Sequence, residues 1–387
     1  MPVVKIRDVE AFVIDLPLER PFLMASRAIT RQTEIIVRIH TDEGVTGVGS
    51  AHGAPLGQVA EIIAKELGPL IVGEDPRNVE HLWQGMFRTT CTPRTQTSAT
   101  TGASLPKGAG RPQVMAAIGG IDIALWDIVG QLYEQPLWRL FGGIRTRIPT
   151  YATGGYYTED GDDTGLADEF AGYVEQGFRE VKLKAGRFSP EHDYQRAAVV
   201  REAIGPDVAL YVDVSQGWNV WDAVRAGRLY ESLDVAWYEE PVHWYDDISG
   251  LAQVARQVQI PLTSGESEFT KQGVRDLILN GHIAITNFDC TKAGGFTEGR
   301  KIAALAETHN VRFAPHHAAH IHAHLVAGVP NGMNVELHPD PVRDPLWERM
   351  FAERPVVDQG ELVLGETPGL GFVLDESALS QLATHVR

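Results

Sequence analysis

Short apolar runs, each followed by an ionisable residue, recur along the middle of the chain. The runs are rich in β-branched and aromatic residues, which is typical of strands buried on both faces. Successive runs are separated by roughly 20–30 residues with helical character, the length of one strand-plus-helix unit. Polar residues at the carboxyl ends of many parallel strands predict a barrel with an active site at that face. The residues that end these runs are Lys182, Lys184, Asp213, Glu239, Glu240, Glu266, Asp289, His316 and Glu336.

The N-terminal part of the chain follows other patterns. Residues 3–18 and 33–51 alternate between apolar and polar positions, as in half-buried strands, and "TDEG" supplies a hairpin turn within the second segment. Helical periodicity follows in residues 58–73 and 77–89. Residues 89–111 are a run of Thr, Ser, Gly and Pro that fits neither period. A structureless loop of this length is either disordered or functional, such as a lid.

These patterns predict an α/β protein with two modules. Residues 113–143 have the composition of one strongly apolar helix ended by two glycines, and the barrel strands follow it. The tail after residue 349 contains short strands and turns that cannot form another strand-plus-helix unit. We therefore expect an α+β capping domain over residues 1–125, completed by residues 350–387, and a barrel over residues 126–349.

Composition narrows the class of protein. The chain has 387 residues, 43% of them hydrophobic, which is enough for a large core. Its formal net charge is −17, and no Lys/Arg-rich run is present, which argues against nucleic acid or an anionic membrane as a partner. No stretch approaches the length of about 20 apolar residues that crosses a bilayer, and the N-terminus does not resemble a signal peptide. Two isolated cysteines, Cys91 and Cys290, fit a reducing compartment, so we expect a cytoplasmic protein.

Three acidic residues at successive strand ends form a candidate metal site. Asp213, Glu239 and Glu266 follow neighbouring strands, whose spacing of about 4.8 Å lets their side chains converge. Carboxylates without thiols favour a hard cation, Mg²⁺ or Mn²⁺, over zinc. The alternative is that each acid is exposed only because strand ends are solvated. Glu240 is expected to pair elsewhere.

Basic residues lie on both sides of this candidate site. Lys182 and Lys184 point to the same face of one strand, where each ammonium group would lower the pKa of the other and prepare a general base. On later strands, Asp289 and His316 could form a dyad in which the carboxylate fixes the imidazole tautomer. Glu336 follows and would be protonated or position a substrate oxygen.

The segment "PHHAAHIHAH" offers another possibility. His316, His320 and His324 are four residues apart, as on one helical face, and could bind zinc. No Cys or acidic ligand accompanies them, so we favour one catalytic histidine at the strand end. His317 competes with His316 for that role.

Together these residues resemble the enolase superfamily and, within it, the mandelate racemase subgroup of muconate lactonizing enzyme-like proteins, particularly its acid-sugar dehydratases. The resemblance extends over nearly the whole chain, although Ser215 stands where many relatives have Asn. It implies a (β/α)7β barrel with an α+β capping domain, a homo-oligomeric assembly that is an octamer by analogy, and contacts from cap residues such as Arg27 and His52 to the distal part of a substrate. The motifs are "VKLKAG", "VDVSQGW", "WYEEPV", "SGES", "FDCTKAGG", "APHH" and "NVELHP".

The resemblance also implies a division of chemical roles. Asp213, Glu239 and Glu266 would hold Mg²⁺. Lys184 and the Asp289–His316 dyad would be acid/base groups on opposite faces of the substrate. Lys182 would support Lys184 and the substrate carboxylate, and Glu336 would hydrogen-bond the developing enolate.

The function expected from this arrangement is removal of the proton α to the carboxylate of a small hydroxy acid. Dehydration of an acid sugar to a 2-keto acid is the first expectation, and racemisation, epimerisation or lactone cycloisomerisation are the alternatives. A non-catalytic metal-binding barrel would keep the carboxylates without the bases. An unrelated barrel enzyme, such as an aldolase, would use Lys184 to form a Schiff base.

Overall fold

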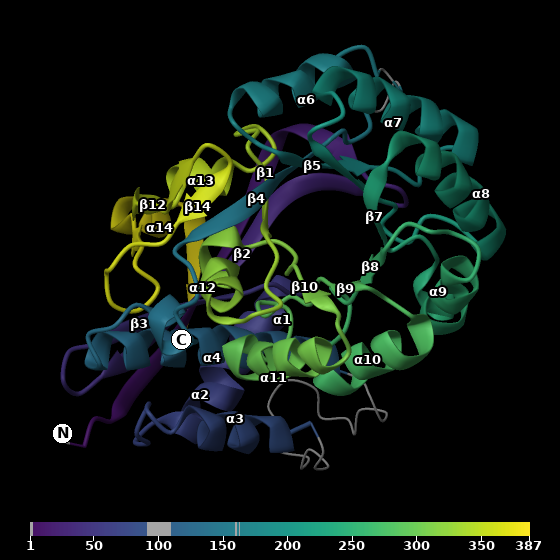
Figure 1. The fold of residues 1–387 in the computed structure, drawn as a ribbon. Coiled ribbons are helices and arrows are strands. Elements are labelled where there is room, and N and C mark those ends of the chain that lie inside the picture. Colours follow the sequence, from purple (N-terminus) through teal and green to yellow (C-terminus); the bar gives the residue numbers. More distant parts are fainter. Residues whose placement is uncertain (1–2, 91–109, 159–160, 162) are drawn as a thin grey trace.

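The computed structural model describes residues 3–90, 110–158, 161 and 163–387. Within these residues, eight parallel strands form the central barrel (Figure 1). The last strand pairs with the first, and an isolated bridge from Phe313 to Gly332 joins the remaining pair of neighbours. The strands are β4 (Arg147–Gly154), β5 (Glu180–Lys184), β6 (Ala209–Asp213), β7 (Val235–Glu239), β8 (Leu262–Ser264), β9 (Ile285–Thr286), β10 (Arg312–Phe313) and β11 (Val335–Leu337).

Helices connect each strand to the next and surround the barrel (Figure 1). Local sequence starts several of them. For example, the Ser189 side chain accepts a hydrogen bond from the His192 amide, and Pro190 occupies the first turn of α7. This confirms the predicted (β/α)7β architecture. The helices are α6 (Leu166–Glu175), α7 (Pro190–Ile204), α8 (Val220–Tyr230), α9 (Asp247–Ala255), α10 (Lys271–Asp276) with a π-helical turn (Leu277–Gly281), α11 (Gly295–Thr308) and α12 (Ala319–Gly328).

The capping region is an antiparallel sheet covered by helices. Its strand order is β16-β1-β2-β3, so a strand from the end of the chain, β16 (Ala383–Val386), pairs with the first strand. Two other tail strands, β14 (Glu361–Val363) and β13 (Val356–Asp358), instead extend the barrel sheet from β4. The cap elements are β1 (Ile6–Leu23), β2 (Ala28–Thr41), β3 (Thr46–Ala51), α1 (Leu56–Glu61), a π-helical segment (Ile62–Leu67), α2 (Gly68–Ile71) and α3 (Val79–Arg88).

The tail contains several further short elements. They are α13 (Pro345–Arg349), β12 (Phe351–Glu353), β13 (Val356–Asp358), β14 (Glu361–Val363), β15 (Val373–Leu374), α14 (Glu376–Leu382) and β16 (Ala383–Val386). The domain boundaries expected from the sequence remain a prediction. The boundary between residues 125 and 126 lies inside one helix, α4 (Arg111–Leu132).

Helix α4 corrects two expectations. The single helix predicted over residues 113–143 is interrupted: α4 ends at Leu132, Glu134 has a φ of 53°, and a short α5 (Leu137–Leu140) begins after Pro136. Proline cannot continue a helix, and a positive φ reverses its direction. The expectation that no stretch approaches membrane-spanning length was also wrong. Helix α4 has 22 residues, and its most apolar 18-residue stretch has a mean hydropathy of 1.4, so it is long and apolar enough to cross a membrane. However, 89% of that stretch is buried inside the protein.

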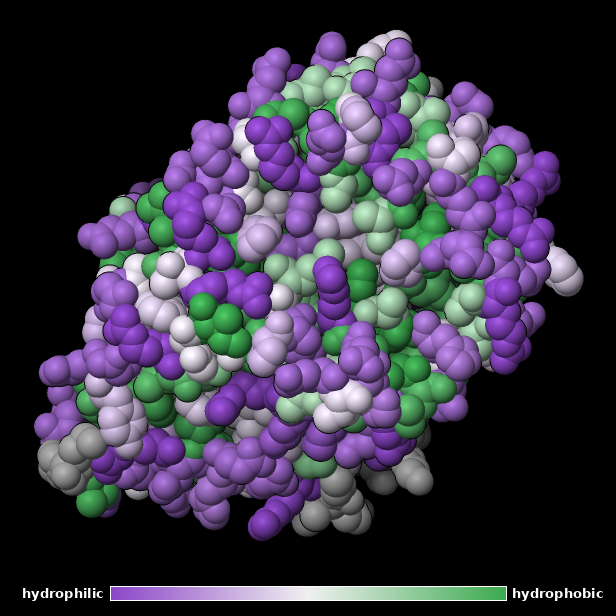
Figure 2. All heavy atoms as spheres, in the orientation of Figure 1, coloured by the Kyte–Doolittle hydropathy of each residue, from purple (hydrophilic) through white to green (hydrophobic). Residues whose placement is uncertain are grey.

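Small residues let α4 pack closely between the cap sheet and the barrel. A Cβ at Gly119 would lie 2.6 Å from the carbonyl oxygen of Cys290, and one at Gly49 would lie 2.1 Å from the carbonyl oxygen of Gly120. No side chain fits at such distances, so glycine is required at both contacts. On the face shown in Figure 2, hydrophilic residues cover much of the surface and apolar residues lie between them.

Candidate active site

The ionisable strand-end residues meet at one end of the barrel. Lys184, Asp213 and Glu239 are register partners at the carboxyl ends of three adjacent strands, β5, β6 and β7. Beneath them, the barrel interior is filled by aromatic rings, with Tyr211 stacked on Trp237 at a centroid distance of 3.8 Å. The floor is therefore apolar and the charges lie above it, which excludes water from beneath the site.

The three predicted metal ligands lie among positively charged and polar partners. Asp213 and Glu239 are each 1% exposed, and the side chain of Glu266 is 14% exposed. Lys184 Nζ binds the Asp213 carboxylate, whereas Lys182 Nζ lies 3.2 Å from both oxygens of Glu239. In the described part of the chain, no group of three or more His, Cys, Asp or Glu side chains has the arrangement of a metal site.

The donor set nevertheless fits a divalent cation. Burial raises the pKa of Glu239 to about 8, and the negative charges of Asp213 and Glu266 add to this rise against the opposing effect of Lys182. The pKa of Glu240 is also raised, mainly by burial and then by the negative charges of Glu266 and Asp213. A hard cation among these oxygens would relieve their repulsion, as expected for carboxylate ligands. Glu240 itself accepts a hydrogen bond from Gln216 Nε2 at 2.9 Å.

The lysines correct the expectation of lowered pKa values. Burial acts to lower the pKa of each ammonium group, but nearby carboxylates outweigh it: chiefly Glu239 and Glu336 for Lys182, and Asp213 for Lys184. Both pKa values are therefore raised. In the protein alone the lysines are counter-ions of buried carboxylates, and this attraction exceeds the repulsion between them.

The Asp289–His316 pair has the predicted geometry. His316 Nδ1 lies 2.9 Å from Asp289 Oδ2, and its other ring nitrogen, Nε2, lies 3.5 Å from Glu266 Oε2. Asp289 is fully buried, and its other oxygen accepts hydrogen bonds from the hydroxyl and amide of Thr291. An ionised Asp289 selects the tautomer with a proton on Nδ1, which leaves Nε2 free to accept a proton.

His317 has different surroundings. Its main-chain amide donates to Glu336 Oε2 at 2.9 Å, and its ring lies between those of His52 and His338, with centroid distances of 5.6 and 5.8 Å. Of these two neighbouring histidines, the structure thus pairs His316 with the buried carboxylate.

Glu336 is surrounded by donors. Lys182 Nζ lies 2.9 Å from Oε1, and the Thr153 hydroxyl donates to the same oxygen at 2.7 Å. Burial acts to raise the pKa of Glu336, but Lys182 and other positive charges reverse the effect and hold it well below its usual value. The proposed protonated form of Glu336 is therefore not the form found in the protein alone.

These groups border one cavity of about 700 Å³ between the barrel and the cap. Lys184, His316 and Glu336 line it. Arg27 and His52, which the resemblance to the family suggested as substrate contacts, line the same cavity from the cap. The amide of His52 donates to the carbonyl of Thr291 at 2.9 Å, which ties the cap to the loop that carries Asp289.

Sequence reasoning missed several residues of this site. Asn287 donates to Glu239 Oε1 at 2.9 Å and accepts from the Glu266 amide at 3.0 Å, so it links two predicted metal ligands. Lys292 Nζ lies 3.2 Å from Glu266 Oε1. Both flank Asp289 in the segment "TNFDCTK", and this proximity was the available signal. Tyr156 and His338 also line the cavity and hydrogen-bond to each other at 3.1 Å.

The histidine run does not form a zinc site. His316 precedes α12, whereas His320 lies among the rings of Trp347, Phe351 and Phe372, at centroid distances of 5.1–5.9 Å. His324 Nε2 lies 3.0 Å from the Leu370 carbonyl oxygen, so it packs the barrel against the tail. The possible lid over residues 89–111 lies mostly outside the described residues.

Comparison with known proteins agrees with this geometry. Residues 8–142 match the mandelate racemase / muconate lactonizing enzyme N-terminal domain, and residues 165–378 match the enolase C-terminal domain-like family. The chain belongs to the mandelate racemase / muconate lactonizing enzyme family. It is thus a member of the enolase superfamily, with a capping domain and a modified barrel.

Three members of this family illustrate the range of similar proteins. An arabinonate dehydratase from Saccharolobus solfataricus is 30% identical, over 94% of each chain. A D-galactarolactone cycloisomerase from Agrobacterium fabrum is 31% identical, over 97% of this chain and 98% of its own. A crystal structure of an L-talarate/galactarate dehydratase mutant liganded with Mg and L-glucarate has a TM-score of 0.85 and 28% identity, covering 99% of this chain and 93% of that chain.

Proposed function

We propose that this protein is a Mg²⁺-dependent enzyme that removes the proton α to the carboxylate of an acid sugar and eliminates water to give a 2-keto acid. One observation carries the proposal. Lys184 and His316 line the same cavity from distant strands, β5 and β10, and the carboxylates Asp213, Glu239 and Glu266 follow strands between them. A metal site with an acid/base group on each side suits proton abstraction next to a carboxylate.

The roles of the bases follow from their hydrogen bonds. His316 Nε2 can take a proton because Asp289 holds the proton on Nδ1 and stabilises the imidazolium that forms. Lys184 carries a proton and can return it from the other side. When the α-proton leaves, its electron pair forms the enolate. The electrons then expel the β-hydroxyl, which receives a proton from Lys184 and departs as water, and the resulting enol tautomerises to the 2-keto acid.

Other residues hold charge in place. Asp213, Glu239 and Glu266 would bind Mg²⁺, or alternatively Mn²⁺, which supplies positive charge that offsets the charge developing on the substrate carboxylate. Lys182 and Glu336 pair with each other at 2.9 Å, so Lys182 remains charged close to the reacting carboxylate. We propose Arg27 and His52 as contacts for the distal part of the substrate.

The similar proteins support both this reaction and one alternative. The arabinonate dehydratase favours water elimination, and the D-galactarolactone cycloisomerase favours isomerisation through the same proton abstraction. With no β-leaving group in position, return of the proton from the opposite side would give racemisation or epimerisation. We also propose a cytoplasmic homo-oligomer, an octamer by analogy, with no nucleic acid or membrane partner.

A screen of acid sugars and hydroxy acids tests the proposal. With Mg²⁺ present, at least one acid sugar should yield a 2-keto acid, and chelation of the metal should stop the reaction. Loss of α-proton to solvent deuterium without a keto product would identify the isomerase alternative. Absence of both product and exchange across the library would reject the proposal, and borohydride trapping of a Lys184 adduct would identify Schiff-base chemistry instead.

A further inference from the structure

The cavity continues from the reaction centre toward the cap, and its charges limit what can occupy that distal part. Lys184, Lys292, Glu266 and Glu336 belong to the reaction centre. Beyond them, the arginines that line the cavity are Arg27, Arg31 and Arg343. A substrate with a second carboxylate would need one of these cations, because a carboxylate that leaves water without a partner loses its hydration energy.

Arg31 is already neutralised. Its Nε binds the carboxylate of Asp15, and its Nη2 donates to the main-chain oxygen of Asp15 at 2.7 Å. Asp15 lines the cavity beside it. The pair therefore presents no net positive charge to a ligand.

Arg343 is neutralised by two acids. Its guanidinium binds Glu169 through both terminal nitrogens, and its Nε lies 3.5 Å from Asp340 Oδ2. The same guanidinium lies 5.1 Å from the ring centroid of Tyr156, which fixes its position in the wall. A further carboxylate here would meet a cation that has already satisfied its charge.

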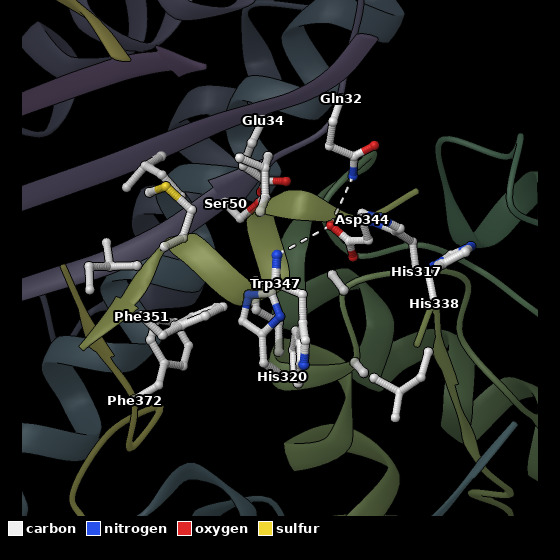
Figure 3. A pocket seen from close by; sticks show the side chains of 18 of the residues that line it. Gln32, Glu34, Ser50, His317, His320, His338, Asp344, Trp347, Phe351 and Phe372 are labelled. Carbon is white, nitrogen blue, oxygen red and sulfur yellow. Dashed lines mark hydrogen bonds between the residues drawn. The ribbon is translucent and has the colours of Figure 1, made fainter. Parts of the chain in front are cut away.

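The wall between the cap and the barrel contributes another acid. Asp344 Oδ1 accepts from Gln32 Nε2 at 3.4 Å and from the Trp347 amide at 3.3 Å, and His317 and His338 lie beside it (Figure 3). Burial raises the pKa of Asp344, and neither its ionised nor its protonated form would attract an anion.

The histidines of this wall behave as neutral hydrogen-bonding groups. Burial lowers the pKa of both His52 and His338 to about 3, so neither carries a positive charge at neutral pH. His52 Nδ1 is buried and has no hydrogen-bond partner among the described residues. Neutral imidazole rings can exchange hydrogen bonds with hydroxyl groups, but they give an anion no charge partner.

Arg27, in the turn between β1 and β2, is the third arginine that lines the cavity. It is exposed, and no ion pair involves it in the described part of the chain. At this exposed position Arg27 can donate hydrogen bonds to distal hydroxyl groups, but water screens its charge, so it adds little to the binding of a second carboxylate. We propose that the substrate is a monocarboxylic polyhydroxy acid, an aldonate, and that the distal cavity discriminates against the corresponding dicarboxylic acid, an aldarate. This inference rests on the proposed function.

Direct binding tests the inference separately from turnover. The probes are aldonates and aldarates of matched stereochemistry, titrated calorimetrically into the Lys184→Met protein with Mg²⁺ at physiological ionic strength. At least one aldonate should bind ten times more tightly than its matched aldarate. Equal or tighter binding of the aldarates, or no binding by any aldonate, would overturn the inference. If the aldonates bind preferentially but the wild-type protein neither converts nor exchanges them, the proposed function fails and the charge inference stands.

A second variant tests the cause of the discrimination. Asp15→Asn removes the partner of Arg31 and should shift the ratio of binding constants toward the aldarates at least threefold. Asp42→Asn is the control, since Asp42 lies in the turn between β2 and β3, outside the residues that line the cavity. An unchanged ratio in Asp15→Asn would refute the role assigned to the Arg31–Asp15 pair.

Discussion

Two buried acids in different regions of this molecule, Glu336 and Asp122, have different partners and different acidities. At the reaction centre, Glu336 lies 2.9 Å from Lys182 Nζ, and its pKa is held well below the usual value because Lys182 and other positive charges outweigh burial. In α4, Asp122 accepts a hydrogen bond from the Thr297 amide at 2.9 Å. Burial raises the pKa of Asp122 to about 7, and hydrogen bonds from the Thr297 side chain and amide only partly oppose it.

Asp127, five residues further along α4, behaves like Asp122. It accepts from the amides of Val48 and Leu370 and from Gln131 Nε2, and burial still raises its pKa to about 6. For Asp122 and Asp127 hydrogen bonds do not compensate for burial, whereas for Glu336 the ammonium group of Lys182 does. Glu239 shows the limit of this effect: Lys182 also lies beside it, but burial and the charges of Asp213 and Glu266 still raise its pKa. At the reaction centre, the pair of Lys182 and Glu336 keeps both groups charged. In α4, Asp127 joins β3 of the cap to the tail of the chain through hydrogen bonds.

The largest expected difference between the two regions concerns turnover. Lys184→Met and His316→Asn should each lower kcat by roughly 10³-fold or more, because each removes a group that moves a proton. Asp122→Asn should leave kcat within about twofold, since it neither lines the cavity nor contacts the reaction centre. The measurement is kcat on the acid sugar found by screening, with circular dichroism to check the fold.

Solvent exchange then separates the two bases. If Lys184→Met still exchanges the α-proton with deuterium while His316→Asn does not, His316 is the abstracting base. Near-normal kcat in either variant would contradict the assignment of the reaction centre.

The next effect is on stability. Lys182→Met leaves Glu239 and Glu336 without their shared counter-ion, and it should lower the free energy of unfolding by about 3–5 kcal/mol in metal-free buffer. Lys65→Met is the matched control. Lys65 pairs with Glu61 on the surface, with side-chain exposures of 52% and 42%, so its loss should cost less than about 1 kcal/mol. Urea unfolding of both variants provides the comparison, and equal losses would show that burial does not strengthen the pairing.

The α4 acids should produce a smaller effect that depends on pH. The pKa of Asp122 is about 7 in the folded protein against 3.8 as its ordinary value, so the folded state holds the proton more tightly and stability falls as pH rises through this range. Asp122→Asn cannot ionise. It should be more stable than wild type by on the order of 2 kcal/mol at pH 8, with little of this gain near pH 4. Thermal unfolding across pH checks this, and a gain independent of pH would contradict it.

The smallest effect concerns a single hydrogen bond at the reaction centre. The Ser215 hydroxyl donates to Asp213 Oδ1 at 3.2 Å, while the Ser215 amide donates to the same oxygen at 2.7 Å. Ser215→Ala removes only the longer bond, so it should weaken Mg²⁺ binding by about two- to fivefold, the effect of a bond contributing about 0.5–1 kcal/mol. Titration of Mg²⁺ measures the change, and a loss above a hundredfold would mean that the hydroxyl has another role.

The site residues at the strand ends could be predicted from the sequence because each follows directly after a short apolar run. A run such as "LYVD" places its last residue at the carboxyl end of a buried strand, and Asp213 and Glu239 therefore meet as register partners. The break after α4 was missed because the apolar pattern continues through residues 137–141, and the interruption depends on Glu134 and Pro136 alone. Apolar spacing identifies buried faces but does not show where a helix changes direction.

The sequence by itself determined the order of strands and helices, the family resemblance and the residues that end each strand, because these depend on periodicity and on short motifs. Only the tertiary structure decided which charges pair. The raised pKa of Lys184, the link of Lys292 to Glu266 and the neutralisation of Arg31 and Arg343 all depend on distances between segments far apart in the chain. Electrostatic interactions change steeply with distance and burial, and neither quantity can be obtained from the order of residues.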